Sequence, residues 1–213
     1  MDGGYGAGCL GDTTQKNWIL GKMPPAVKSS VPGYAITGAA LGVLAGAVYR
    51  AIDMGSAELA MRELLLLAAS GGIVGSAGAI ADLNIRKLIG SGLAGALGAM
   101  VLMLVMLLVV QVKPSLMVGA WVIMASFALF AALVALVEGL MEGNRAVLGY
   151  SVLMAAAAGE IGFAAGWPLS KLVVGEATPF VYGALYSGCI WTAIALARDL
   201  AKREAPVPES SGT

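Results

Sequence analysis

The amino-acid sequence predicts an all-α protein, a polytopic transmembrane helix bundle with six spans and Gly-zipper packing between them. Apolar residues make up 59% of the chain and charged residues 12%, and the mean hydropathy is +0.85. A soluble domain averages about 25% charged residues, because its surface must face water. Six apolar segments of spanning length, separated by charged turns, complete the argument.

The six expected spans lie near residues 33–49, 59–80, 88–112, 116–137, 146–167 and 180–197. A helix needs about 20 mostly apolar residues to cross a bilayer. The stretch 88–137 is too long for one span, and Lys113-Pro114 places a charge and a helix breaker at its middle. Residues 1–32 are expected to form a polar, Gly-rich leader on the inner side, and residues 199–213 a short disordered tail.

The basic residues indicate how the spans are oriented. Nine of the thirteen fall on the side that holds both termini and four on the other. The nine are Lys16, Lys22, Lys28, Arg86, Lys87, Arg145, Arg198, Lys202 and Arg203, against Arg50, Arg62, Lys113 and Lys171. Because basic residues concentrate on the cytoplasmic side of short loops, both termini are expected in the cytoplasm, or in the matrix of a mitochondrion. The pattern does not distinguish a bacterial cytoplasmic membrane from a mitochondrial inner membrane.

Composition also argues against several classes of activity. The chain has no histidine, which is the usual haem ligand in membrane bundles and the commonest ligand of catalytic zinc. Cys9 and Cys189 are far apart and form no metal or redox motif. The net charge is zero, so no basic field is available for nucleic acid. We therefore expect no enzyme, no cofactor, no metal site and no nucleic-acid partner.

Small residues recur at four-residue spacing in several spans. In lipid, helices associate through close backbone approach, and small-xxx-small faces permit it. Two interpretations stay open: packing within the bundle, and docking of another subunit. The candidate packing glycines are Gly38, Gly42, Gly46, Gly71, Gly75, Gly90, Gly98, Gly162 and Gly166.

Glu160 is the one ionisable residue well inside an expected span. A charged carboxylate at mid-bilayer costs about 2.5–3.5 kcal/mol on insertion scales. It either locks the last two spans together through hydrogen bonds to Tyr182, Tyr186 or Thr192, or binds a proton or cation on a path between helices.

The remaining charges near span ends are interpreted as ordinary solvated loop charges. This group contains Glu58, Arg62, Glu63, Asp82, Arg86, Lys87, Glu138, Glu142 and Arg145.

Two functions from different classes remain. The first is a non-catalytic integral membrane subunit or scaffold of a larger assembly, whose partners are the lipid bilayer and other membrane subunits or copies of itself. The alternative is a transporter or channel for a small solute or an ion that uses Glu160.

Overall fold

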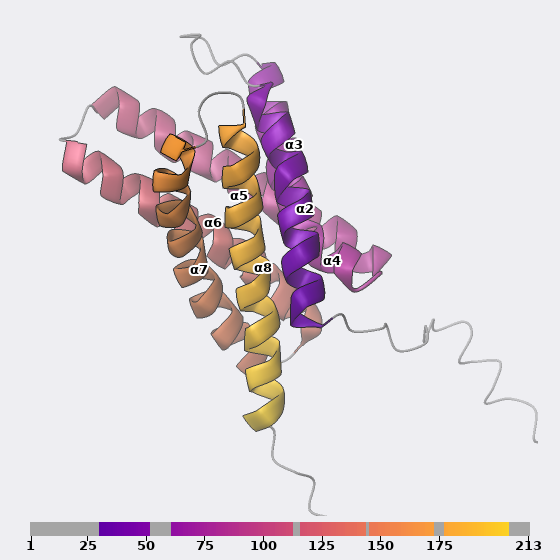
Figure 1. The fold of residues 1–213 in the computed structure, drawn as a ribbon. Coiled ribbons are helices and arrows are strands. Elements are labelled where there is room, and N and C mark those ends of the chain that lie inside the picture. Colours follow the sequence, from indigo (N-terminus) through magenta and orange to yellow (C-terminus); the bar gives the residue numbers. More distant parts are fainter. Residues whose placement is uncertain (1–29, 52–60, 113–115, 144, 173–176, 205–213) are drawn as a thin grey trace, which may run out of the picture.

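This computed structural model describes residues 30–51, 61–112, 116–143, 145–172 and 177–204 (Figure 1). The described residues are helical, with no strand among them. They contain six helices that are long and apolar enough to cross a membrane, the second of them interrupted near its end. The expected all-α, six-span membrane bundle is confirmed.

The helices are α2 (Val31–Arg50), α3 (Met61–Gly75), α4 (Ala77–Ala81), α5 (Ile85–Val112), α6 (Leu116–Glu142), α7 (Arg145–Leu172) and α8 (Thr178–Glu204). Together α3 and α4 form one span, from Arg62 to Ala81. The interruption falls at Ser76, whose hydroxyl donates to the carbonyl of Gly72 over 2.7 Å. A hydroxyl bonded back to the preceding turn is a known cause of local helix distortion.

The observed bounds differ from the expected ones mainly at the ends of the last three helices, where α6 continues past residue 137 to Glu142. Helix α7 continues past residue 167 to Leu172 with Pro168 inside it, and α8 continues to Glu204. The expected tail is therefore helical over its first six residues, where Lys202 pairs with Asp199 one turn earlier over 3.0 Å. The expected leader up to residue 29 and the tail beyond Glu204 lie outside the described residues.

The six spans form a closed ring. Each packs mainly against two neighbours, in the order α2, α3, α5, α6, α7, α8 and back to α2. The first and last helices are therefore side by side, as Figure 1 shows for the indigo and yellow ribbons. Helix α2 begins, and α8 ends, at the same end of this ring.

Large apolar side chains cover the outside of the ring. Among them, Ile36, Leu65, Leu97 and Leu153 are between 62% and 72% exposed. The interior contains smaller residues and a few large ones, among them Trp191. An outward apolar surface of this extent suits lipid rather than water.

Two tight turns connect consecutive helices, one between α4 and α5 and one between α6 and α7. Leu83, with φ of 51°, lies in the turn after α4, and the side chain of Asn84 accepts the backbone N–H groups of Arg86 and Lys87 over 3.1 and 3.3 Å. Gly143, with φ of 70°, follows α6, and glycine adopts this left-handed conformation without strain.

Candidate functional site

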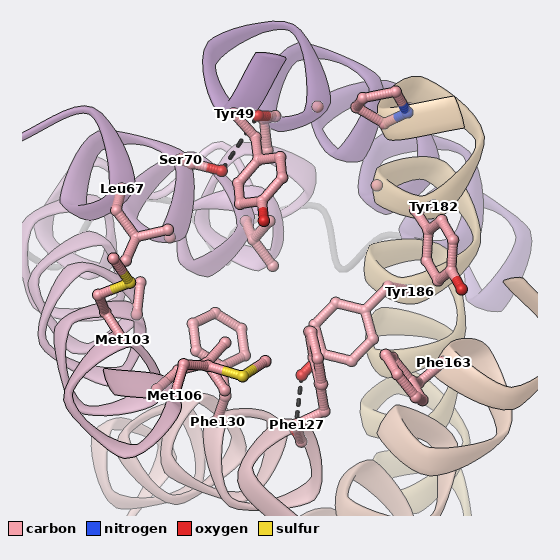
Figure 2. Close-up of a pocket in the computed structure, with 18 of the residues that line it drawn as sticks. Tyr49, Leu67, Ser70, Met103, Met106, Phe127, Phe130, Phe163, Tyr182 and Tyr186 are labelled. Atoms are coloured by element: carbon pink, nitrogen blue, oxygen red, sulfur yellow. Dashed lines mark hydrogen bonds between the residues drawn. The ribbon is translucent and has the colours of Figure 1, made fainter. Parts of the chain in front are cut away.

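A cavity of about 470 Å³ lies inside the ring (Figure 2). Its wall takes residues from all six spans, and none of them is Asp, Glu, Lys or Arg. The wall consists of Ala45, Gly46, Tyr49, Leu67, Ser70, Gly71, Val74, Ala99, Leu102, Met103, Met106, Ile123, Phe127, Phe130, Phe163, Thr178, Pro179, Tyr182, Gly183 and Tyr186. This volume is in the range of small-molecule sites, about 300–1,000 Å³.

The cavity occupies one end of the ring. Its residues come from the second halves of α2, α5 and α7, the first half of α8, the first half and centre of α6, and the middle of the span that α3 and α4 form together. Because consecutive spans run in opposite directions, these segments lie at the same level. We call this half of the bundle the cavity end.

A tryptophan closes the cavity toward the other end. Trp191 is fully buried, and its indole N–H donates to the carbonyl of Val74, a wall residue, over 2.8 Å. Its ring stacks on Tyr34 with centroids 6.3 Å apart. Gly78 makes room for the indole, since a Cβ on Gly78 would overlap its six-membered ring. This packing joins α2, α4 and α8 below the cavity.

Beyond Trp191 lies a cluster of buried polar and charged side chains, which we call the charged end. Its members come from the start of α2, the turn after α4, the start of α5 and the last turns of α6 and α8. They are Tyr34, Asp82, Lys87, Glu138, Glu142 and Arg198.

Arg198 is at the centre of the charged end. Its Nη2 lies 2.6 Å from an oxygen of Glu138 and 2.6 Å from one of Glu142, and its Nη1 lies 3.6 Å from Asp82. The hydroxyl of Tyr34 donates to Asp82 and accepts from Arg198. Arg198 also lies over the Tyr34 ring, 4.8 Å from its centroid. One side chain of α8 thus connects α2, α6 and the turn after α4.

Lys87 supplies the second positive charge. Its ammonium lies 3.3 Å from Asp82, 3.4 Å from Glu138 and 3.2 Å from Glu142. The three carboxylates offer oxygens within 4.8 Å of one another, a spacing that suits a metal ion. Lys87 and Arg198 both lie within ion-pair distance of all three carboxylates, so we interpret the cluster as an ion-pair network.

The interpretation of these residues as solvated loop charges was wrong for four of them. Asp82 is 5% exposed and Glu138 1%, and the Lys87 and Glu142 side chains are 13% and 15% exposed. The physical reason is the ring, which brings the ends of α5, α6 and α8 together so that each charge faces an opposite charge. Arg86 and Arg145 are exposed, as expected.

Glu63 also departs from the expectation. It is 6% exposed in the first turn of α3, and its Oε2 has no hydrogen-bond partner among the described residues. Glu58 lies outside those residues.

The structure separates Glu160 from the two tyrosines grouped with it. Glu160 is exposed on α7, whereas Tyr182 and Tyr186 line the cavity. The Tyr186 hydroxyl donates to the carbonyl of Phe127 over 2.6 Å, and the Thr192 hydroxyl donates to that of Gly188 over 2.7 Å. Neither hydroxyl therefore donates to Glu160, and Glu160 does not line the cavity.

The nine candidate packing glycines each meet a neighbouring helix. A Cβ at Gly42 or Gly46 would overlap the backbone of α8, and one at Gly71 or Gly75 would overlap that of α5. At Gly38 it would lie 2.9 Å from the Cβ of Trp191. The other four face the adjacent helix: Gly90 meets Met141, Gly98 meets Phe130, Gly162 meets Tyr186 and Gly166 meets Tyr182. Docking of another subunit on such a face stays a prediction.

No family model, curated protein or solved structure matches this chain. The cavity and the charged end are therefore the features that indicate a function.

Proposed function

We propose that the protein is a small membrane carrier that binds a solute in the central cavity and exposes it to each side of the membrane in turn. The observation that carries the proposal is a cavity of about 470 Å³ lined by all six spans. Protein interiors are close-packed, and a bundle that served only as a scaffold would gain dispersion contacts by filling this space.

The unequal ends of the ring support the same function. The cavity end is only partly enclosed, whereas Trp191 and the ion pairs of Arg198 close the charged end. A carrier needs two closures that alternate around one site. By the distribution of basic residues, we assign the charged end to the cytoplasmic side.

The charged end has the composition of a closure that can open. Its ion pairs join side chains of different helices, and Glu138 Oε2 and Arg198 Nε have no hydrogen-bond partner among the described residues. Buried ion pairs gain little net stability over their separated, hydrated state because desolvation offsets their attraction. Water that enters from the charged end would therefore hydrate these side chains and replace the ion pairs at a small cost in free energy.

Cysteine accessibility tests the carrier function. Ser70→Cys places a thiol on the cavity wall in a chain whose Cys9 and Cys189 are replaced by serine and alanine. We expect a membrane-impermeant thiol reagent to modify it from either face of reconstituted vesicles, because a carrier opens its site to both sides. Leu65→Cys, on the outside of the same helix and 64% exposed in the bundle, faces lipid and should stay unmodified.

Modification of Ser70→Cys from one face alone would indicate a binding pocket without transport. Protection from both faces would contradict the proposal altogether.

A second candidate function, subunit of a larger membrane assembly, is favoured by the position of Glu160. Its carboxylate is exposed on α7 between Leu153 and Ile161, which are 72% and 63% exposed. A carboxylate facing hydrocarbon is costly, and a partner helix that offered a hydrogen bond would remove that cost.

Native gels of gently solubilised membranes test this second candidate. Glu160→Gln keeps the hydrogen-bonding shape and should leave the assembly intact, whereas Glu160→Leu should shift the chain toward the monomer. Leu153→Ala, on the same exposed side of α7, is the control. A monomeric unsubstituted chain, or equal behaviour of the Gln and Leu variants, would exclude this role for Glu160.

A further inference from the structure

The cavity wall has no ionised side chain that could compensate a charged ligand. None of its residues is Asp, Glu, Lys or Arg, and the ion pairs of Arg198 lie beyond Trp191. Burying an unpaired charge among apolar groups costs far more than binding returns. The wall therefore selects against an anionic ligand.

One side of the cavity is aromatic (Figure 2). Phe127 stacks on Phe163 with centroids 4.6 Å apart and meets the edge of Tyr186 at 5.1 Å. The ring centroids of Phe130 and Tyr186 are 5.9 Å apart, and those of Tyr182 and Phe163 are 6.1 Å apart. These five rings come from α6, α7 and α8 and form a continuous surface, against which a further ring can stack or pack edge-on.

The opposite side is adaptable. Met103 and Met106 of α5 and Leu67 of α3 point into the same space (Figure 2). Methionine is flexible and polarisable and makes favourable contacts with ring edges. A flat molecule can therefore lie between the aromatic surface and the methionines, whose side chains adjust to ligands of different shape.

The wall offers few polar groups. The Ser70 hydroxyl donates to the carbonyl of Ala45 over 3.1 Å and that of Tyr186 donates to Phe127, so each oxygen keeps a lone pair for a ligand donor. The hydroxyl of Tyr49 points toward the cavity in Figure 2. A ligand with one hydrogen-bonding group finds a partner here, whereas a strongly polar one does not.

From these features we infer that the cavity binds an uncharged aromatic molecule that carries a single hydrogen-bonding group. The inference rests on the proposed function for taking the cavity as the solute site. It goes further by excluding anionic metabolites as the solute.

Two dyes that differ by one charged group test the inference. N-phenyl-1-naphthylamine is neutral and has one N–H donor, and 8-anilino-1-naphthalenesulfonate carries the same rings with a sulfonate. We expect saturable fluorescence enhancement with the neutral dye on the purified full-length chain. The sulfonate should bind at least about tenfold more weakly, because no wall residue compensates its charge.

Matched tryptophan substitutions on α5 locate the binding. Met106→Trp fills the cavity and should weaken binding of the neutral dye at least about tenfold. Leu104→Trp adds the same side chain at a position 57% exposed on the outside of the helix, so it should leave binding unchanged. Met103→Trp is a second cavity-filling variant, used if Met106→Trp does not give a monodisperse protein.

Equal affinity for the two dyes would overturn the inference, as would neutral-dye binding that neither cavity-filling variant weakens. In either case, modification of Ser70→Cys from both membrane faces would still support a carrier, with a solute of another class. If the dyes behave as expected but Ser70→Cys reacts from one face only, the ligand class holds and the transport function fails.

Discussion

Arg198 determines how the charged end is held together. It is 7% exposed and contacts side chains of three other segments of the ring. Removing one partner of a buried ion pair leaves the other charge buried without compensation, which typically costs about 3–5 kcal/mol. Lys202, four residues later on the same helix, is a matched comparison because its ion pair with Asp199 lies at the surface.

We predict that Arg198→Ala lowers the free energy of unfolding by about 3–5 kcal/mol. Lys202→Ala should change it by less than about 0.5 kcal/mol, since its pair is exposed and screened by solvent. Equilibrium unfolding in mixed micelles, followed by circular dichroism, measures both. Similar losses for the two variants would mean that the charged end is not an effective network.

The sequence shows where these charged residues lie along the chain, but it does not indicate that they are buried. Arg198, Glu138 and Asp82 all lie near span ends, where charges usually meet water, and nothing in their spacing distinguishes them from Arg145, which is exposed. Each finds its partner on a helix that is distant in the sequence: Glu138 and Arg198 are 60 residues apart. Pattern analysis along one chain does not see such pairs.

At the scale of helices, the contact between α2 and α8 depends on glycine. Gly42 of α2 and Gly183 of α8 face each other so closely that a Cβ on either would overlap the backbone of the other. Close backbone approach of this kind gives the dispersion contacts that hold helices together in lipid. By contrast, Gly149 on α7 has no atom within 4 Å of an added Cβ.

Two Gly→Ala substitutions should therefore act in opposite directions. Gly42→Ala forces α2 away from α8 and is expected to cost about 1–3 kcal/mol of stability, the usual range for overpacking. Gly149→Ala meets open space and removes backbone freedom from the unfolded chain, so it should stabilise by about 0.5–1 kcal/mol. Thermal unfolding in detergent reports both signs, and stabilisation by Gly42→Ala would contradict the α2–α8 contact.

The four-residue spacing predicted which glycines face another helix but not which helix each one meets. Gly42 is matched by Gly183, and Gly71 by Gly95, and neither partner was among the candidate packing residues. Choice of partner follows from the order of helices in the ring, which small-residue spacing does not encode.

For the molecule as a whole, six spans arranged in a ring predict which helix ends face the same side of the membrane. Helix α2 begins at the same end at which α8 ends, and the contacts of Arg198 with Tyr34 hold these ends together. The ends of α5 and α7 lie at the cavity end.

In a chain without its native cysteines, Ser30→Cys and Lys202→Cys should be labelled from one face of sealed vesicles, and Val112→Cys and Leu172→Cys from the other. All four positions are exposed. The distribution of basic residues further predicts that the first pair is cytoplasmic. Labelling of Ser30→Cys and Lys202→Cys from opposite faces would contradict the six-span topology.

Hydropathy alone predicted the number of spans, because long apolar segments separated by charged turns have few alternatives. It did not predict the cavity. The wall residues Ala45, Ser70, Met103, Phe127 and Tyr186 come from five different helices, and each is unremarkable within its own span. The cavity forms only when the helices are arranged in a ring.

Closure of the ring by its first and last helices has a consequence for synthesis in the cell. The segments between α2 and α8 amount to about 130 residues, so at roughly 5–20 residues per second α2 waits roughly 6–25 seconds in the bilayer before its partner is made. During that interval its glycine face and Tyr34 are without the contacts that α8 provides. A nascent chain at this stage presents an unfilled helix-binding surface, the kind of surface that membrane chaperones and quality-control proteases recognise.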